Sequence, residues 1–67
     1  MTPMIAALTK RIREEFDEAP GLQLTVAEGV RFWSLDAETC AGVLEQLHQT
    51  GFLVRTRDGR YRRPRAT

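Results

Sequence analysis

The stretch LTVAEGVRFWSLDAETCAGVLEQLHQTGFLVRTRDGRY, residues 24 to 61, decides the fold of this 67-residue chain. Near its start, Thr25 and Glu28 are spaced as a capping box, in which each side chain satisfies the other residue's free backbone N–H. A helix is therefore predicted from about Val26. Val30 and Trp33 share a buried face with Val26, because all three fall on one side of a helix of 3.6 residues per turn.

A further helix is predicted after Ser34 and Leu35, which break the periodic pattern. Asp36 is a good N-cap, because its carboxylate can accept a hydrogen bond from a backbone N–H of the first turn. Gly51 is expected to end the helix in the left-handed conformation, with Phe52 folding back on the last turn. The buried stripe of this helix is predicted to consist of Cys40, Val43, Leu44 and Leu47.

A β-hairpin is predicted next, because Asp58-Gly59 is a two-residue turn signal of type I′, in which both residues take a positive φ. Such a turn would place three residue pairs opposite one another: Arg57 with Arg60, Thr56 with Tyr61, and Arg55 with Arg62. Four arginines would then lie on one face of the hairpin. Like charges opposite one another destabilise a sheet, so these arginines favour a role outside the fold.

The segment before residue 24 adds one helix and one short strand to this prediction. Thr2-Pro3 is typical of a helix start, and Pro20-Gly21 of its end. The apolar stripe of this helix is predicted to be Ile5, Leu8, Ile12 and Phe16. Residues 22–24 alternate apolar and polar, which favours a strand that joins the sheet of the hairpin. We expect a single domain over residues 1–67, with its core in 3–63 and a frayed tail at 64–67.

The net charge of +1 hides two segments of opposite charge. Residues 1–54 carry four basic and eight acidic side chains, whereas residues 55–67 carry six arginines and one aspartate. Separation of this kind predicts an anionic partner for the basic segment. A basic tail that serves only solubility is the alternative.

Other classes of function find little support in the composition. One cysteine, Cys40, and one histidine, His48, provide neither a disulfide nor zinc-ligand spacing, and no nucleophile has a partnered base. We therefore expect no metal, no cofactor and no enzymatic activity. The apolar runs are short, so a membrane span and a signal-peptide core are not expected. These features favour a cytoplasmic location.

The order helix, short strand, helix, tight turn, helix and hairpin resembles the winged helix-turn-helix of bacterial transcription regulators. The resemblance covers roughly residues 5–63. It includes the leucine-threonine start, the leucine in the turn, a threonine early in the third helix and the glycine that precedes the arginine-rich wing. It implies an α+β fold with three helices, a short strand and a C-terminal β-hairpin wing. In that family the third helix enters the DNA major groove and the wing touches the DNA backbone or minor groove.

Carried onto this chain, the resemblance implies a set of nucleic-acid-binding residues. On the third helix the groove-facing positions would be Ala37, Glu38, Ala41, Gly42, Glu45 and Gln46. On the wing and tail the phosphate contacts would come from Arg55, Arg57, Arg60, Arg62, Arg63 and Arg65. The third helix departs from the family pattern, because its acidic residues would approach a polyanion.

The leading hypothesis is a DNA-binding protein, with double-stranded DNA as its partner and a role in transcription regulation. The alternative is a protein-interaction module in which Glu38 and Glu45 of the third helix meet a basic partner. Phe32, predicted to lie off the buried face of its helix, and neighbouring Arg31 would belong to that interface. RNA binding is a third reading, weakened by the scarcity of exposed aromatic residues. The sequence leaves self-association open.

Overall fold

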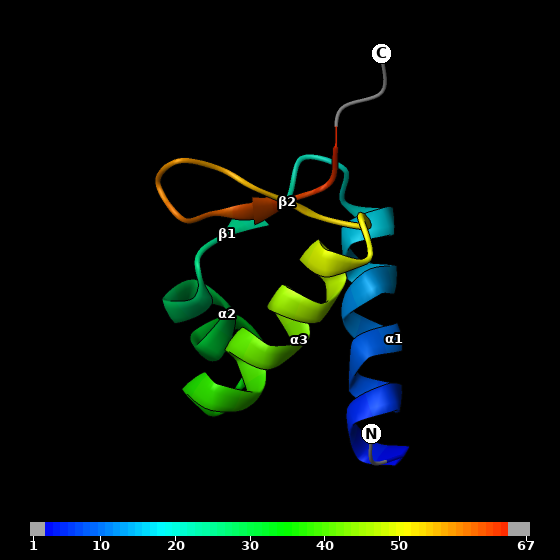
Figure 1. Ribbon diagram of the computed structural model, residues 1–67. Coiled ribbons are helices and arrows are strands. Elements are labelled where there is room, and N and C mark those ends of the chain that lie inside the picture. Colours follow the sequence, from blue (N-terminus) through cyan, green and yellow to red (C-terminus); the bar gives the residue numbers. More distant parts are fainter. Residues whose placement is uncertain (1–2, 65–67) are drawn as a thin grey trace.

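The structure is a computed structural model that describes residues 3–64 (Figure 1). It is an α+β arrangement of three helices and one three-stranded antiparallel sheet. The helices are α1 (Pro3–Glu18), α2 (Val26–Trp33) and α3 (Ala37–Gln49), and the strands are β1 (Gln23–Leu24), β2 (Val54–Arg55) and β3 (Tyr61–Arg62). The predicted helix cap at Thr2, the predicted phosphate contact Arg65 and the other residues of the predicted tail after Pro64 lie outside the described residues.

The capping residues predicted for α2 and α3 are confirmed. Thr25 and Glu28 form the complete capping box, with hydrogen bonds of 3.2 and 2.9 Å. The Asp36 carboxylate caps α3 by accepting from the Thr39 N–H at 2.9 Å. Gly51 takes a φ of +85° after α3, as predicted. The intervening turn places Ser34 in the left-handed conformation, which the sequence did not indicate.

The core forms where the three helices and the sheet meet. It contains the predicted stripe of α3 in full, two of the four predicted stripe residues of α1 and the tryptophan of α2: Ile12, Phe16, Leu24, Trp33, Cys40, Val43, Leu44, Leu47, Leu53 and Tyr61. Leu8, Val26 and Val30 are only partly buried against it. Phe32 is 59% exposed, as expected for a residue off the buried face of α2.

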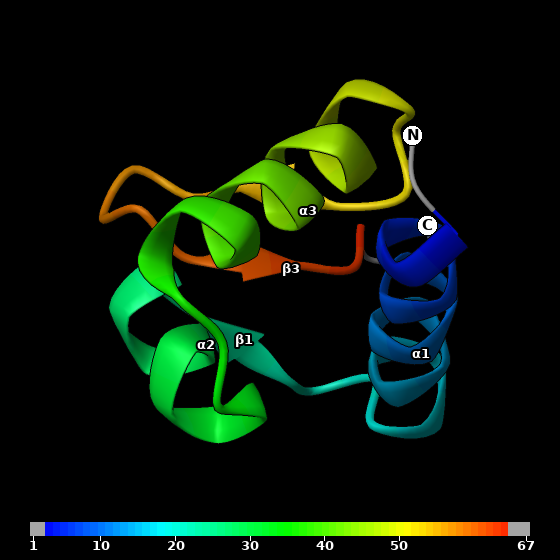
Figure 2. The same cartoon turned by 90° about the horizontal axis from the view of Figure 1, so that it is seen from below.

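The sheet has the order β1-β3-β2, so the last strand lies in the middle. Leu24 of β1 pairs with Tyr61 of β3, and both side chains are buried toward the helices. The predicted addition of residues 22–24 to the hairpin sheet is therefore confirmed for Gln23–Leu24. Figure 2 shows the hairpin loop pointing away from α1, beyond the α2–α3 unit. Within residues 3–64, no helix combines the length and hydrophobicity needed to cross a membrane.

The predicted hairpin register is wrong by one residue. Arg55 pairs with Tyr61, and Val54 pairs with Arg62. The Thr56 N–H donates to the Arg60 carbonyl at 2.8 Å, so three residues, 57–59, form the loop in place of two. Of the pair Asp58-Gly59, only Gly59 has a positive φ, +83°. A three-residue loop with a left-handed glycine at its end therefore replaces the type I′ turn.

Candidate nucleic-acid interface

The shifted register removes the predicted strip of four arginines on one face. Residues directly opposite each other in an antiparallel sheet share a face, so Arg55 lies on the same side as Tyr61, toward the helices. Arg62 is one position further along β3 and lies on the other side. The hairpin arginines consequently point in several directions, and each has a different environment.

Arg55 lies at the sheet edge beside α3. Its guanidinium is 3.9 Å from the Glu45 carboxylate, and both side chains are about half exposed. The Tyr61 hydroxyl donates to the same carboxylate at 3.4 Å. Tyr61 thus covers the core with its ring and reaches α3 with its hydroxyl, so the buried ring is not available to stack on a base. Surface ion pairs of this length contribute little stability, so Arg55 can exchange Glu45 for another anion.

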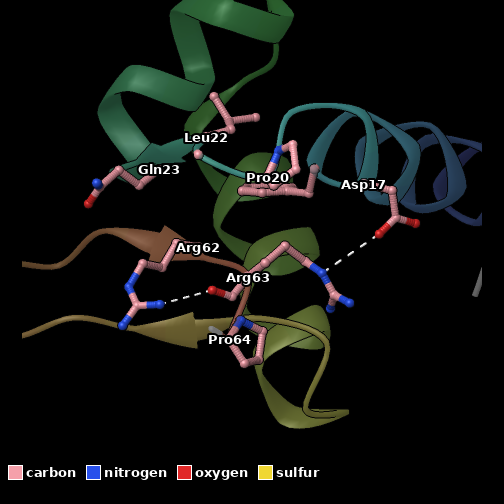
Figure 3. Close-up of a pocket in the computed structure, with 9 residues that line it drawn as sticks. Asp17, Pro20, Leu22, Gln23, Arg62, Arg63 and Pro64 are labelled. Carbon is pink, nitrogen blue, oxygen red and sulfur yellow. Dashed lines mark hydrogen bonds and ion pairs between the residues drawn. The ribbon is translucent and has the colours of Figure 1, made fainter. Parts of the chain in front are cut away.

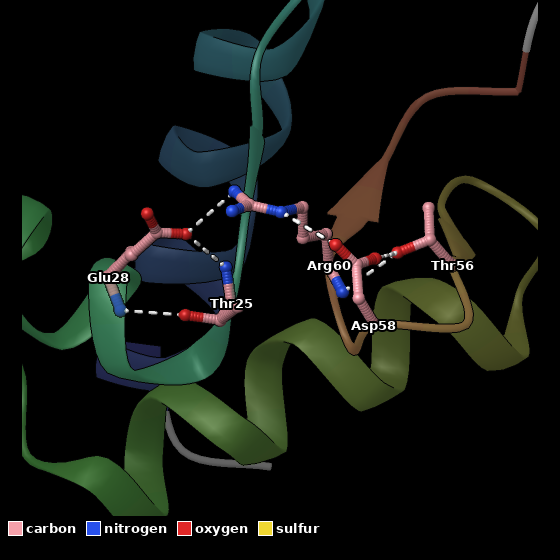
Figure 4. A network of polar contacts seen from close by, with 5 residues as sticks. All are labelled: Thr25, Glu28, Thr56, Asp58 and Arg60. Atoms are coloured by element: carbon pink, nitrogen blue, oxygen red, sulfur yellow. Dashed lines mark hydrogen bonds and ion pairs between the residues drawn. The ribbon is translucent and has the colours of Figure 1, made fainter.

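Arg60 is held by two carboxylates (Figure 4). Its Nε donates to Asp58 at 3.0 Å, and its NH1 donates to Glu28 at 3.2 Å. Asp58 also accepts from the Thr56 hydroxyl, and the Arg60 backbone N–H donates to that hydroxyl at 3.0 Å. These bonds explain the three-residue loop, because Thr56 and Asp58 bind the turn backbone and side chains directly.

The same contacts lower the pKa of two carboxyl groups. The pKa of Glu28 lies below its ordinary value of 4.5, mainly because the Thr25 backbone N–H donates to the carboxylate and, to a lesser extent, because Arg60 is close. The pKa of Asp58 lies below its ordinary value of 3.8, first through the Thr56 hydroxyl and then through Arg60. Both groups are therefore anionic at neutral pH and neutralise charge on the hairpin.

Arg62 and Arg63 line an open pocket of about 480 Å³ between the end of α1, the turn at Pro20 and β3 (Figure 3). The Arg63 guanidinium lies 3.7 Å from Asp17 and stacks over the Phe52 ring, with 3.8 Å between Cζ and the ring centroid. Arg63 also donates to the Phe52 carbonyl. Arg63 therefore ties α1 to the segment after α3, a structural role that the sequence prediction of a phosphate contact did not include.

Arg57 differs from the other hairpin arginines. It is exposed in the loop and has no hydrogen-bond or ion-pair partner within residues 3–64. Arg62 donates to the Arg63 carbonyl at 2.9 Å and has no carboxylate partner in the described part of the chain. The uncompensated positive charge of the hairpin is thus centred on these two residues.

The exposed side of α3 carries the positions that the resemblance assigns to the groove. Ala37, Glu38, Gly42 and Gln46 are exposed, and Ala41 and Glu45 are partly exposed. Glu38 and Glu45 are two turns apart, and only Glu45 has an arginine partner. The surface is consequently low in steric bulk, with one acid neutralised by Arg55 and one open to solvent.

Several contacts at this surface escaped the sequence analysis. Glu28 was identified only as a capping residue, although it also binds Arg60 across 32 positions of sequence. Asp17 and Phe52 were not connected with Arg63, because they lie on separate elements. The Asp58–Arg60 pair is the exception, since a two-residue spacing across a tight turn brings such side chains together and offered a usable signal.

No protein-family model matches this chain, and neither a curated protein nor a solved structure matches it. Its function is therefore inferred from the geometry and chemistry of its own residues.

Proposed function

We propose that this chain is a winged-helix DNA-binding protein that contacts the phosphate backbone mainly through the β2–β3 hairpin. The observation that carries the proposal is the exposed, uncompensated Arg57 in a hairpin loop that points away from α1 (Figure 2). The order of elements and the sheet order β1-β3-β2 are compatible with a winged-helix layout. In such a layout, α2 and α3 form the helix-turn-helix and the hairpin is the wing.

Charge on the hairpin supports phosphate contacts more than base recognition. Arginine donates bidentate hydrogen bonds to phosphate oxygens, and Arg57 and Arg62 are available for this without losing a carboxylate partner. The exposed positions of α3 offer Glu38 and Gln46, of which glutamine can bind adenine and glutamate can accept from cytosine. We infer weak sequence preference and a regulatory role.

A salt titration with random duplex DNA tests this proposal. Each phosphate neutralised by an arginine contributes about −0.9 to the slope of log K against log[salt]. Contacts from Arg57 and Arg62 alone would give a slope of about −1.8, and recruitment of Arg55 and Arg60 would bring it to about −3.6. Absence of binding at roughly 50 mM salt, where phosphate contacts are strong, would overturn the proposal.

A protein-interaction module is the second candidate, and one observation favours it. Phe32 is 59% exposed on α2 and contacts the buried Trp33 edge-on, with 5.5 Å between ring centroids. Aromatic side chains, phenylalanine included, are enriched in protein–protein interfaces. The variant Phe32→Ser separates the two candidates, because a hairpin-centred DNA contact predicts unchanged DNA affinity. Met4→Ser is the matched control, since Met4 is the other exposed large hydrophobic residue of the described chain.

A further inference from the structure

Arg60 is placed on the proposed DNA-binding hairpin, yet its guanidinium faces inward to two carboxylates. The side chain is 37% exposed, and the donors Nε and NH1 are directed to Asp58 and Glu28 at 3.0 and 3.2 Å. A phosphate would use the same donors, because carboxylate and phosphate oxygens accept from guanidinium in similar geometry. Intramolecular carboxylates and DNA would therefore compete for one side chain.

Both carboxylates keep other donors when Arg60 leaves them. Glu28 Oε1 accepts from the Thr25 N–H at 2.9 Å as part of the capping box. Asp58 accepts from the Thr56 hydroxyl. Neither carboxylate is buried, so water can replace the arginine on the remaining oxygen lone pairs. Release of Arg60 thus leaves the α2 cap and the hairpin loop with their own hydrogen bonds.

The ion pairs are also of the kind that exchange easily. The side chains of Glu28 and Asp58 are 51% and 65% exposed, and exposed ion pairs contribute little net stability because solvent and salt screen them. Little free energy is therefore lost when Arg60 leaves the two carboxylates, and the ion pairs lower the affinity for a phosphate without preventing the contact. Before DNA binds, Glu28 and Asp58 reduce the number of uncompensated positive charges on the hairpin.

We propose that Glu28 and Asp58 act as an internal phosphate mimic that occupies Arg60 and holds the affinity of the hairpin for DNA below its unmasked value. This inference rests on the proposed DNA-binding function and specifies how the same surface is restrained. Loss of negative charge at the two positions is expected to free Arg60 for a phosphate. The hairpin then gains one contact.

The test uses Glu28→Gln and Asp58→Asn, singly and together, with a random duplex as the probe. Glutamine retains the capping box, and asparagine followed by glycine retains a turn-forming pair. We expect the double variant to bind more tightly and to steepen the slope of log K against log[salt] by about 0.9, the value of one phosphate contact. Glu14→Gln/Glu18→Gln is the matched control for the double variant, because it removes two negative charges from exposed side chains of α1 that have no partner within residues 3–64.

A cycle with Arg60→Ala identifies the side chain responsible. Arg60→Ala should weaken binding less in the wild-type background than in the Glu28→Gln/Asp58→Asn background, where it should abolish the gain. Circular dichroism confirms that each variant is folded. If the wild type binds DNA and the double variant binds no more tightly than the Glu14→Gln/Glu18→Gln control, the inference is overturned while the proposed function stands. If no variant binds at roughly 50 mM salt, the proposed function is overturned as well.

Discussion

Gly29 of α2 lies directly against Cys40 of α3: a Cβ atom placed on Gly29 would be 2.8 Å from Cys40 Sγ and 3.0 Å from the Trp33 ring. Glycine in the middle of a helix costs about 1 kcal/mol relative to alanine. The close approach explains the glycine, because α2 and α3 could not pack at this distance with a methyl group between them. Burial at this contact also raises the pKa of the Cys40 thiol.

We predict that Gly29→Ala destabilises the protein in spite of its better helix propensity. The Cys40 and Trp33 side chains are buried and cannot move without disturbing the core, and overpacking of this kind typically costs about 1–3 kcal/mol. Urea unfolding followed by circular dichroism measures the effect. Cys40→Ala in the same chain should recover part of the loss, because it removes the closest atom.

Gly42→Ala is the matched control for that substitution. Gly42 is also helical, but a Cβ atom there meets no other atom within 4 Å. Alanine should therefore stabilise the protein by about 0.5–1 kcal/mol through helix propensity alone. Equal effects at the two glycines would contradict the packing explanation.

The indole N–H of Trp33 donates to the Glu15 carboxylate of α1. We predict that Glu15→Ala lowers the free energy of unfolding by about 1 kcal/mol, because the largely buried indole loses its acceptor. Trp33 is the single tryptophan of the chain, so its fluorescence reports both the environment of the ring and the unfolding transition. Glu14→Ala, which changes the charge equally on the exposed side of α1, should have a much smaller effect.

Acid should destabilise the protein through its capping carboxylates. The Thr39 backbone N–H holds the pKa of Asp36 below its ordinary value of 3.8, and the Thr25 N–H holds the pKa of Glu28 below 4.5. Groups with a lowered pKa in the folded state stabilise it above their unfolded pKa, and this contribution disappears as the pH falls through the folded pKa. The melting temperature should therefore fall as the pH drops below about 4.5.

Asp36→Asn and Glu28→Gln together test that assignment of the acid effect. Both replacements can still cap a helix but do not titrate. The melting temperature of the double variant should depend less on pH in the acid range than that of the wild type. An unchanged pH profile would show that other carboxyl groups dominate.

Arg57→Ala should weaken binding to random duplex DNA and reduce the magnitude of the salt slope by about 0.9, because it removes one phosphate contact. Fluorescence anisotropy at several salt concentrations measures both quantities. Arg11→Ala on α1 removes the same charge from an exposed residue that has no partner within residues 3–64. Similar losses for the two variants would indicate a general charge effect and contradict a hairpin-centred contact.

Local signals in the sequence were sufficient for most of the fold. The capping box at Thr25, the N-cap at Asp36 and the stripe of α3 depend on residues within a few positions of one another, and all three are confirmed. The hairpin register was not predictable in the same way. Asp58-Gly59 favours a two-residue turn by itself, whereas the Thr56 and Asp58 side chains bind within the loop and add one residue to it.

The contacts of the candidate site were harder to predict from the sequence than the core residues. Its basic residues were evident from composition, but their charge depends on partners that are distant in the chain. Arg60 meets Glu28 across 32 positions, and Arg63 meets Asp17 through the arrangement of α1 and β3. Only the assembled fold shows that the hairpin presents fewer uncompensated charges than its arginine count indicates.

The central place of β3 in the sheet limits how the role of the hairpin can be studied. Tyr61 is buried, and its strand is the one that joins β1 to β2. A chain shortened before residue 61 would lose a core side chain and both strand pairings together, so truncation would report on folding and not on recognition. The basic surface can be altered only by exchanging side chains on an intact backbone. Arg57 and Arg62 are therefore open to substitution, whereas the β3 backbone cannot be removed.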